Sequence, residues 1–172
     1  MKIFLIGFMG CGKSSLGRKL ATFLKYEFVD LDRLIEKEVN MSIAQYFSDV
    51  GEDKFREVEK NILQQTNFRE NIVIATGGGA PCYFDNVGWM NGQGKTVYLS
   101  MEPKALANRL INSKSERPLI KGLNYDELVN FISLKLGTRE TFYSRAQYVV
   151  NGLDLSAEKL AAYLDLPTLS LK

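Results

Sequence analysis

A glycine-rich segment near the start of the chain carries residue types that bind phosphate. Residues 7–14 read GFMGCGKS and match the pattern G-x-x-x-x-G-K-[ST]. Glycines allow backbone N–H groups to curl around a phosphate, and a following helix N-terminus adds positive potential. Lys13 can then reach the β- and γ-phosphates of a nucleotide, while the Ser14 hydroxyl can bind Mg²⁺. A dinucleotide site is not indicated, because Ser15 stands where G-x-G-x-x-G requires a third glycine.

Two aspartates follow the second apolar segment. Asp30 and Asp32 are separated by one residue, and in an extended strand such residues point to the same side. The carboxyl ends of strands line the ligand crevice of an open α/β sheet, so we expect both carboxylates near the γ-phosphate. One would lie near Mg²⁺ and the other would accept the proton of an acceptor hydroxyl. The alternative is that the two acids only end a strand and cap the next helix.

Arginines and glycines form three further candidates. Arg56 lies within a helical pattern with Glu52 four residues before it and Glu59 three residues after it, which favours surface ion pairing slightly over ligand binding. Residues 77–79 are three successive glycines after an apolar segment, and they suit either close approach of a ligand or a plain loop. Arg139 precedes two aromatic residues, and it is either a ligand-binding residue or an isolated charge on a helix face.

A charged segment without apolar periodicity covers residues 112–122 and includes Arg117. The ordinary interpretation is a solvated loop. The functional interpretation is a mobile lid that closes, excludes water and brings Arg117 to the transferring phosphate.

These residues need a scaffold of alternating strands and helices. Short apolar runs, typical of strands buried on both faces, cover residues 3–6, 28–31, 72–75, 96–99 and 148–150. Helical patterns cover residues 13–24, 42–50, 52–68, 104–111, 125–136 and 156–164. The alternation predicts βαβ units and an α/β fold, a three-layer sandwich around a central parallel sheet. The length of 172 residues predicts a single domain, residues 1–172.

Composition excludes several functions. The net charge is +2 and no run of five or six like charges occurs, so neither nucleic-acid binding nor a polybasic membrane patch is indicated. No histidine is present, which excludes Ser-His-Asp and Cys-His catalysis. Two cysteines do not indicate a disulfide framework and fit a reducing cytosol. The apolar run at residues 3–6 is too short for a membrane span and is not a signal peptide.

Taken in order, the motifs resemble those of the shikimate kinases. They are GFMGxGKSS at 7–15, Asp30-x-Asp32, FRxxE at 55–59, TGGG at 76–79, RPL at 117–119 and RxxFY at 139–143. They span most of the chain. The resemblance implies the fold of the nucleoside monophosphate kinases, with a five-stranded parallel sheet, a substrate-binding region at about 32–61 and a lid at about 112–122. It also implies transfer of the ATP γ-phosphate to the 3-hydroxyl of shikimate, within the route to chorismate and the aromatic amino acids.

The same resemblance implies roles for single residues. Lys13, Asp32 and Arg117 would be catalytic, with Asp32 as the base and Arg117 at the migrating phosphoryl group. Asp30 would act on Mg²⁺ through water, alongside Ser14. The residues implied to bind ATP are Gly10, Cys11, Gly12, Lys13, Ser14, Ser15 and Arg117. The residues implied to bind shikimate are Asp32, Arg56, Gly77, Gly78, Gly79 and Arg139. Arg56 and Arg139 would grip the substrate carboxylate.

Less specific positions and alternatives remain open. An apolar wall around the substrate would map to Met9 and to Phe47 or Phe55, and adenine would contact Arg109, Asn112 or Ser113. Cys11 is interpreted as a small filler, with a reactive thiol as the weaker hypothesis. The family resemblance and the lack of an additional apolar helix lead us to expect a cytoplasmic monomer.

Competing functions are weighed by the same motifs. A gluconate kinase would share the phosphate loop and the sheet, but FRxxE and the triple glycine favour shikimate. A pair of arginines suits a small carboxylate better than the base of a nucleoside monophosphate. A nucleotide-dependent switch without turnover is disfavoured by both aspartates, and the N-K-x-D signature of GTPases is absent.

Overall fold

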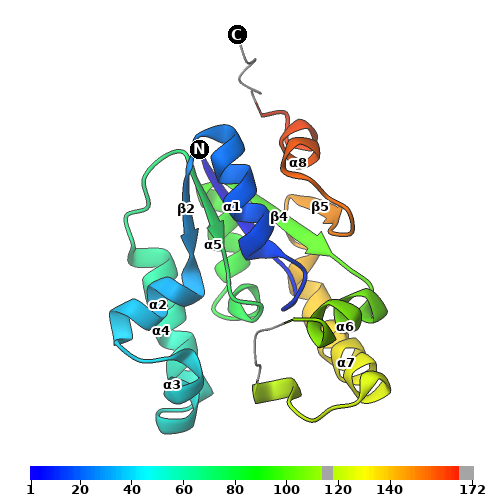
Figure 1. Ribbon diagram of the computed structural model, residues 1–172. Coiled ribbons are helices and arrows are strands. Elements are labelled where there is room, and N and C mark those ends of the chain that lie inside the picture. Colours follow the sequence, from blue (N-terminus) through cyan, green and yellow to red (C-terminus); the bar gives the residue numbers. More distant parts are fainter. Residues whose placement is uncertain (114–117, 167–172) are drawn as a thin grey trace.

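Five short apolar segments pair into one parallel sheet. The computed structural model describes residues 1–113 and 118–166 (Figure 1). The strands are β1 (Lys2–Ile6), β2 (Glu27–Asp30), β3 (Ile72–Ala75), β4 (Lys95–Ser100) and β5 (Tyr148–Asn151). They stand in the order β2-β3-β1-β4-β5, and each neighbouring pair is parallel. The predicted five-stranded parallel sheet is confirmed.

Helices cover both faces of this sheet. They are α1 (Lys13–Leu24), α2 (Leu31–Val39), α3 (Ile43–Asp49), α4 (Glu52–Gln65), α5 (Asn86–Gln93), α6 (Pro103–Ile111), α7 (Tyr125–Tyr143) and α8 (Ala157–Tyr163). Two short 3-10 helices, η1 (Ala80–Cys82) and η2 (Pro118–Ile120), complete the described elements. The result is the predicted sandwich of helices, sheet and helices.

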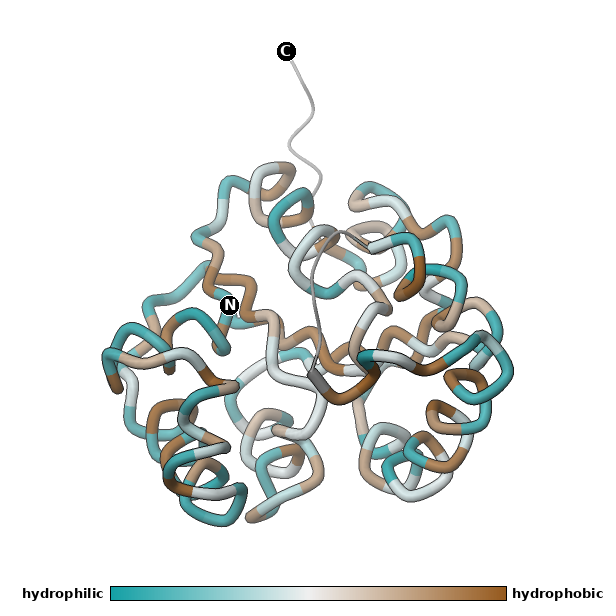
Figure 2. Tube along the Cα trace, turned by 60° about the horizontal axis from the view of Figure 1, so that its bottom comes forward, coloured by the Kyte–Doolittle hydropathy of each residue, from teal (hydrophilic) through white to brown (hydrophobic). Residues whose placement is uncertain are grey.

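The central strand contributes to two separate hydrophobic cores. Ile3 and Leu5 of β1 pack with α1, α6, α7 and α8, whereas Phe4 and Ile6 pack with α2, α4 and α5. All four side chains are fully buried. Successive residues of a strand point to opposite faces, so a strand covered on both sides must be apolar throughout. Figure 2 shows hydrophobic and hydrophilic residues alternating along the surrounding helices, as expected for helices with one face on a core.

The helix predictions were incomplete in the second and third crossovers, between β2 and β3 and between β3 and β4. Helices α2 and α5 were not predicted, and α5 carries two glycines that weaken its helical pattern. Helix α4 ends at Gln65 and not at residue 68, because Thr66 takes an extended conformation. Helix α7 continues seven residues beyond the predicted end at 136, so Arg139 lies inside a helix.

Within residues 1–113 and 118–166, no helix combines the length and the apolar character that a bilayer crossing requires.

Gly17 offers a test of how tightly α1 packs on the sheet. A methyl group added there would lie 2.8 Å from the Phe28 ring and 3.1 Å from Leu5, whereas one added at Gly137 of α7 would meet nothing within 4 Å. We expect Gly17→Ala to lower the free energy of unfolding by about 1–3 kcal/mol through overpacking. Gly137→Ala should raise it by up to about 1 kcal/mol through helix propensity. Urea unfolding measures both, and a stabilised Gly17→Ala variant would contradict this packing.

Candidate active site

The phosphate-loop sequence folds as a turn between β1 and α1. Gly10 and Gly12 have φ of 83° and 100°, in the left-handed region where a side chain is strained, and Gly12 is the N-cap of α1. Lys13 begins the helix, and its buried Nζ donates hydrogen bonds to the carbonyls of Gly7 (2.8 Å) and Phe8 (3.0 Å). The loop therefore places an ammonium group and a helix N-terminus at the carboxyl end of the central strand.

Ser14, at the start of α1, and Asp30, at the end of β2, lie next to each other. The Ser14 hydroxyl donates to Oδ2 of Asp30 at 2.6 Å. Asp30 is also the N-cap of α2, because its Oδ1 accepts from the Arg33 backbone N–H at 3.5 Å. The helix-capping alternative for Asp30 is thus confirmed alongside its place next to the phosphate loop. A hydroxyl beside a carboxylate is a ligand pair that suits Mg²⁺, which keeps several waters and phosphate oxygens in its shell.

Asp32 does not lie on a strand, and the extended geometry predicted for it is wrong. The strand ends at Asp30, and Asp32 occupies the first turn of α2. Burial raises the pKa of the Asp32 carboxyl above its ordinary value, the positive charge of Lys13 opposes this, and Asp30 and Glu36 add to it. Asp32 is therefore a partly buried carboxyl within the electrostatic reach of Lys13, as expected for a group near the γ-phosphate.

Charged side chains lie close to the triple glycine after β3. A methyl group at Gly77 would lie 2.7 Å from Oδ1 of Asp32, and one at Gly79 would lie 2.5 Å from Nη2 of Arg56. At Gly78 the methyl group would lie 3.5 Å from Nη1 of Arg139. Three residues predicted from separate motifs lie against three successive glycines.

Arg56 makes the predicted ion pairs, but it is not on the surface. Its Nη1 donates to Oε2 of Glu59 at 2.7 Å, and its Nη2 donates to Oε1 of Glu52 at 2.9 Å. Only 7% of Arg56 is exposed, and Glu59 is 1% exposed. A buried charge needs partners of this kind, and its burial shows that it is more than a solubilising residue.

Glu59 has one carboxylate oxygen without a partner. Among the described residues, no group forms a hydrogen bond to the buried Oε1, which faces Gly77. The pKa of Glu59 is raised to about 7, mainly by burial. The nearby Asp32 also raises it, whereas Arg56 lowers it. Glu59 was predicted only as a motif position and as a surface partner of Arg56. Its acidic neighbour Asp32 comes from another helix, α2, and no local sequence signal indicates it.

Arg139 and Tyr143 approach the triple glycine from α7. The guanidinium of Arg139 lies 5.6 Å from the ring centroid of Phe8, within cation–π range. One turn later, the buried Tyr143 hydroxyl donates to the Gly78 carbonyl at 2.5 Å. Arg139 and Arg56 therefore lie on neighbouring glycines, as their predicted shared ligand requires.

Aromatic residues and cysteines complete the surroundings. Phe47 and Phe55 stack at 4.6 Å, with Arg56 over both rings, so the predicted apolar wall is close to the charged cluster. Cys11 is 2% exposed, which fits its interpretation as a filler. Cys82 was assigned no role, and burial raises the pKa of its thiol to about 11.

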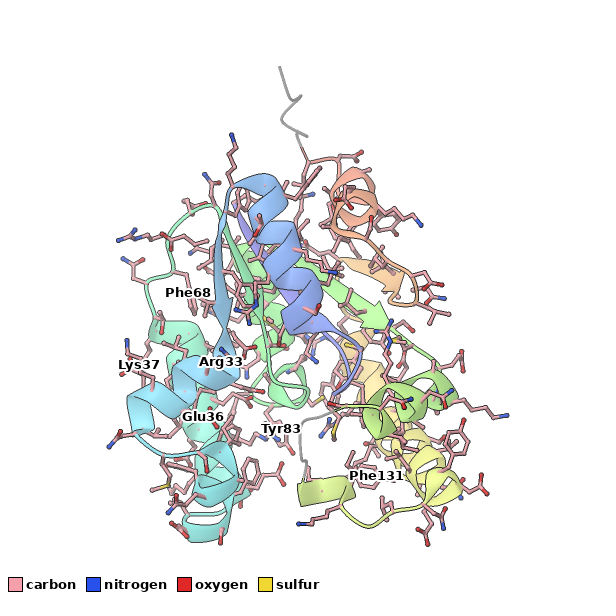
Figure 3. All side chains as sticks on the ribbon, viewed as in Figure 1. Arg33, Glu36, Lys37, Phe68, Tyr83 and Phe131 are labelled. Carbon is pink, nitrogen blue, oxygen red and sulfur yellow. The ribbon has the colours of Figure 1, made fainter. Side chains whose placement is uncertain are left out.

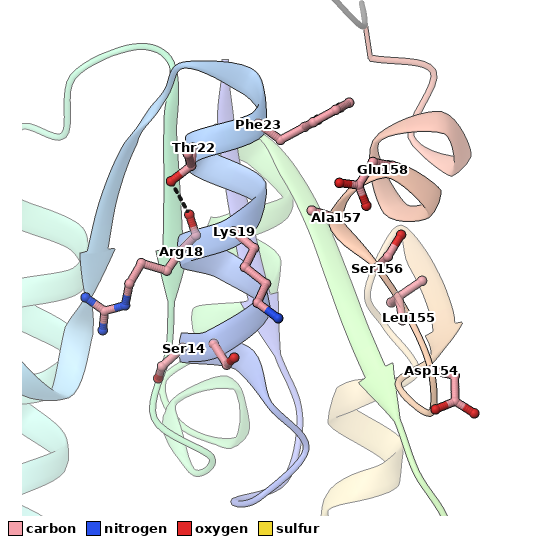
Figure 4. Close-up of a pocket in the computed structure, with 11 residues that line it drawn as sticks. Ser14, Arg18, Lys19, Thr22, Phe23, Asp154, Leu155, Ser156, Ala157 and Glu158 are labelled. Atoms are coloured by element: carbon pink, nitrogen blue, oxygen red, sulfur yellow. Dashed lines mark hydrogen bonds between the residues drawn. The ribbon is translucent and has the colours of Figure 1, made fainter.

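A cavity of about 960 Å³ opens on the other side of the phosphate loop. It is lined by α1 and by the turn before α8, including Ser14, Ser15, Asp154 and Leu155 (Figure 4). The turn before α8 was not predicted to contribute. Arg109 connects the two sides, because its Nη1 donates to the Cys11 carbonyl at 3.1 Å and its Nη2 donates to the Gly152 carbonyl at 3.3 Å.

The charged cluster at the triple glycine and the guanidinium of Arg109 thus both lie next to the phosphate loop. Arg117 lies outside the described residues. The model of the family described as shikimate kinase matches residues 9–165 of the chain. The chain belongs to the shikimate kinase family. A family member from Bacteroides thetaiotaomicron is 44% identical over 155 residues, which cover 90% of this chain and 89% of that one.

Solved structures of the shikimate kinase family agree with the fold. The crystal structure of shikimate kinase from Bacteroides thetaiotaomicron has a TM-score of 0.92 at 42% identity and covers 96% of this chain and 99% of that chain. Shikimate kinase from Acinetobacter baumannii in complex with shikimate has a TM-score of 0.81 at 32% identity, with 95% of this chain and 89% of that chain covered.

The buried Glu59 predicts a dependence of stability on pH. The folded protein holds this proton up to about pH 7, whereas an unfolded chain releases it near the ordinary value of 4.5. The folded state thus binds more protons between these values, and Glu59 lowers the free energy of unfolding as the pH rises, by up to about 1.4 kcal/mol per pH unit. Glu59→Gln should flatten this slope in urea unfolding series.

The matched control is Glu57→Gln, on the same helix but exposed and paired only with the exposed Lys54. It should leave the slope unchanged. Equal slopes for the wild type and Glu59→Gln between pH 4.5 and 7 would show that Glu59 is ionised throughout this range.

Proposed function

We propose that this kinase transfers the γ-phosphate of ATP to the 3-hydroxyl of shikimate, giving 3-phosphoshikimate and ADP. The observation that carries the proposal is the convergence of Asp32, Arg56 and Arg139 on the triple glycine beside the phosphate loop. One carboxylate and two guanidinium groups suit an acceptor that has a reacting hydroxyl at one end and a carboxylate at the other. In metabolism, the reaction is a step towards chorismate and the aromatic amino acids.

The nucleotide binds through the phosphate loop in this proposal. Backbone N–H groups of residues 10–15 and the N-terminus of α1 face the phosphates, and Lys13 exchanges its carbonyl acceptors for phosphate oxygens. The adjoining cavity beside Ser15 and Asp154 has room for the nucleoside. Arg109 lies between these two parts.

Ser14 and Asp30 would hold Mg²⁺, Ser14 directly and Asp30 through water. The hydrogen bond between them supports this assignment, because it brings both oxygen atoms together. When bound, Mg²⁺ neutralises charge on the transferring phosphate.

Asp32 acts as the general base in this scheme. Its raised pKa makes the carboxylate a better acceptor for the hydroxyl proton than an exposed aspartate. The charge of Lys13 favours the ionised form of that carboxylate, and Lys13 would bind the phosphate on its other side. Proton removal and phosphate transfer therefore take place at adjoining groups.

The acceptor carboxylate lies between Arg56 and Arg139, and the backbone of residues 77–79 contacts the ring. Arg117 would stabilise the migrating phosphoryl group from a lid at about 112–122. We further propose that residues 1–172 act as one kinase domain and as a cytoplasmic monomer that binds no nucleic acid. The resemblance of the chain to its family supports these last assignments.

The acceptor is identified by a coupled assay of ADP production with MgATP. We expect turnover with shikimate and little with gluconate, AMP or water. The FRxxE and triple-glycine motifs favour shikimate over gluconate, and AMP has no carboxylate for the two arginines. Excess EDTA should abolish the reaction and added Mg²⁺ should restore it. Preferred turnover of gluconate would overturn the arginine assignments while leaving phosphate transfer intact.

Substitutions of Asp32 and Arg139 should change different kinetic constants. Asp32→Asn is expected to lower kcat by about 10²- to 10⁴-fold, because the hydroxyl proton loses its acceptor. Arg139→Ala should mainly raise the KM for shikimate, by about 10- to 100-fold, since a charged hydrogen bond is worth about 1.5–3 kcal/mol. Steady-state kinetics measure both. Asp53→Asn, an exposed aspartate on α4, is the control and should match the wild type.

A near wild-type kcat for Asp32→Asn would remove Asp32 as the base. An equal loss of kcat and no change in KM for Arg139→Ala would place Arg139 at the reacting phosphate instead.

A further inference from the structure

Tyr83, which follows η1, is in contact with the guanidinium of Arg56. The Tyr83 ring centroid lies 4.6 Å from Cζ of Arg56, closer than the rings of Phe55 at 5.2 Å and Phe47 at 5.7 Å. A cation at this distance from an aromatic ring is attracted to it. Three rings therefore surround one buried cation, and Tyr83 is the nearest.

A second contact runs through Glu52. The Tyr83 hydroxyl donates to Oε1 of Glu52 at 3.2 Å, and the same oxygen accepts from Nε (3.2 Å) and Nη2 (2.9 Å) of Arg56. Glu52 is about half exposed, and an exposed carboxylate alone holds an arginine only weakly. With Tyr83, the three side chains close a triangle in which each contacts the other two.

The backbone fixes Tyr83 in this position. Its carbonyl accepts from the Asn86 N–H at 2.9 Å, and the Asn86 side chain donates to the Ala80 carbonyl at 2.9 Å. Asp85, in the same turn, forms an ion pair with Arg145. Tyr83 is thus anchored directly after η1, four residues beyond the triple glycine, on the side of the molecule towards which the strands point (Figure 3).

The arginine contacts leave a defined face for a ligand. An arginine has five N–H groups, and Glu52 and Glu59 take three of those of Arg56. The other two lie one on each terminal nitrogen, and their direction depends on the plane of the guanidinium. Tyr83 sets this plane, because its ring lies against the guanidinium and its hydroxyl holds the Glu52 oxygen.

We propose that Tyr83 is a positioning residue for the acceptor carboxylate, which orients the guanidinium of Arg56 and so determines affinity and selectivity for acids. This inference rests on the proposed function, in which Arg56 binds that carboxylate. Tyr83 belongs to none of the motifs that identified the family, so its role is carried by its contacts alone.

The test compares Tyr83→Leu with Tyr83→Phe and Phe84→Leu in steady-state kinetics. Tyr83→Leu removes the ring and the hydroxyl and should raise the KM for shikimate about 3- to 30-fold, with kcat and the KM for ATP changed less than about 2-fold. Tyr83→Phe keeps the ring and should show a smaller increase. Phe84→Leu, at the half-exposed neighbouring ring that contacts Lys60, should leave all three constants unchanged.

A neutral acceptor separates positioning from a general structural effect. The shikimate analogue with a primary alcohol in place of the carboxylate should bind the wild type and Tyr83→Leu equally, because Arg56 no longer discriminates. An equal loss for both acceptors, or no loss for shikimate in either Tyr83 variant, would overturn the proposal. If Tyr83→Leu does not fold by circular dichroism, the same comparison with Tyr83→Phe decides. The proposed function fails separately, if the wild type does not phosphorylate shikimate.

Discussion

The register of β2, β3 and β1 sets the geometry on which the site depends. Leu5 of β1 and Asp30 of β2 both pair with Ala75 of β3, so these residues form one row across the sheet. Two residues beyond this row lie the start of the phosphate loop after β1, Asp32 in the first turn of α2, and Gly77 after β3. Parallel pairing forces these three points to the same edge, and a slip of one residue would turn every side chain of the strand to the other face. The carboxylate next to the phosphate loop is therefore a consequence of strand pairing, before any contact within the site is considered.

The buried cluster around Arg56 is built for specificity more than for stability. A guanidinium and a carboxylate lose several kcal/mol each of hydration on burial, and a well-packed apolar pair of the same volume is often at least as stable. Glu59 illustrates the cost, because burial raises its pKa in spite of the adjacent arginine, and one of its oxygens has no partner among the described residues. Such a cost persists in active sites because a rigid, dehydrated cation recognises a carboxylate far better than a solvated one does. The aromatic rings around the guanidinium exclude water and limit its rotation.

Sequence patterns predicted the parallel sheet and the phosphate loop because both depend on local signals, namely apolar runs and glycine spacing. They placed Asp30 correctly beside Ser14, but they assumed that the strand continued to Asp32, since a helix starting at Leu31 has little to distinguish it from a strand end. The burial of Arg56 could not be predicted from Glu52 and Glu59, because acids at these spacings from an arginine are equally common on exposed helices. Tyr83 was not predicted, because its partners on α4 are some thirty residues away in the sequence. Contacts between distant elements are the part that local patterns do not encode.

Helix α7 holds the glycine segment at two points. Arg139 and Tyr143 are four residues apart and so share one face, and they contact the side and the carbonyl of the same glycine, Gly78. A rotation of α7 about its axis would shift the guanidinium and break the tyrosine hydrogen bond together. The two positions are consequently coupled in evolution: a substitution that moves one of them is tolerated only if the other adjusts, and covariation between them is the expected record of that constraint.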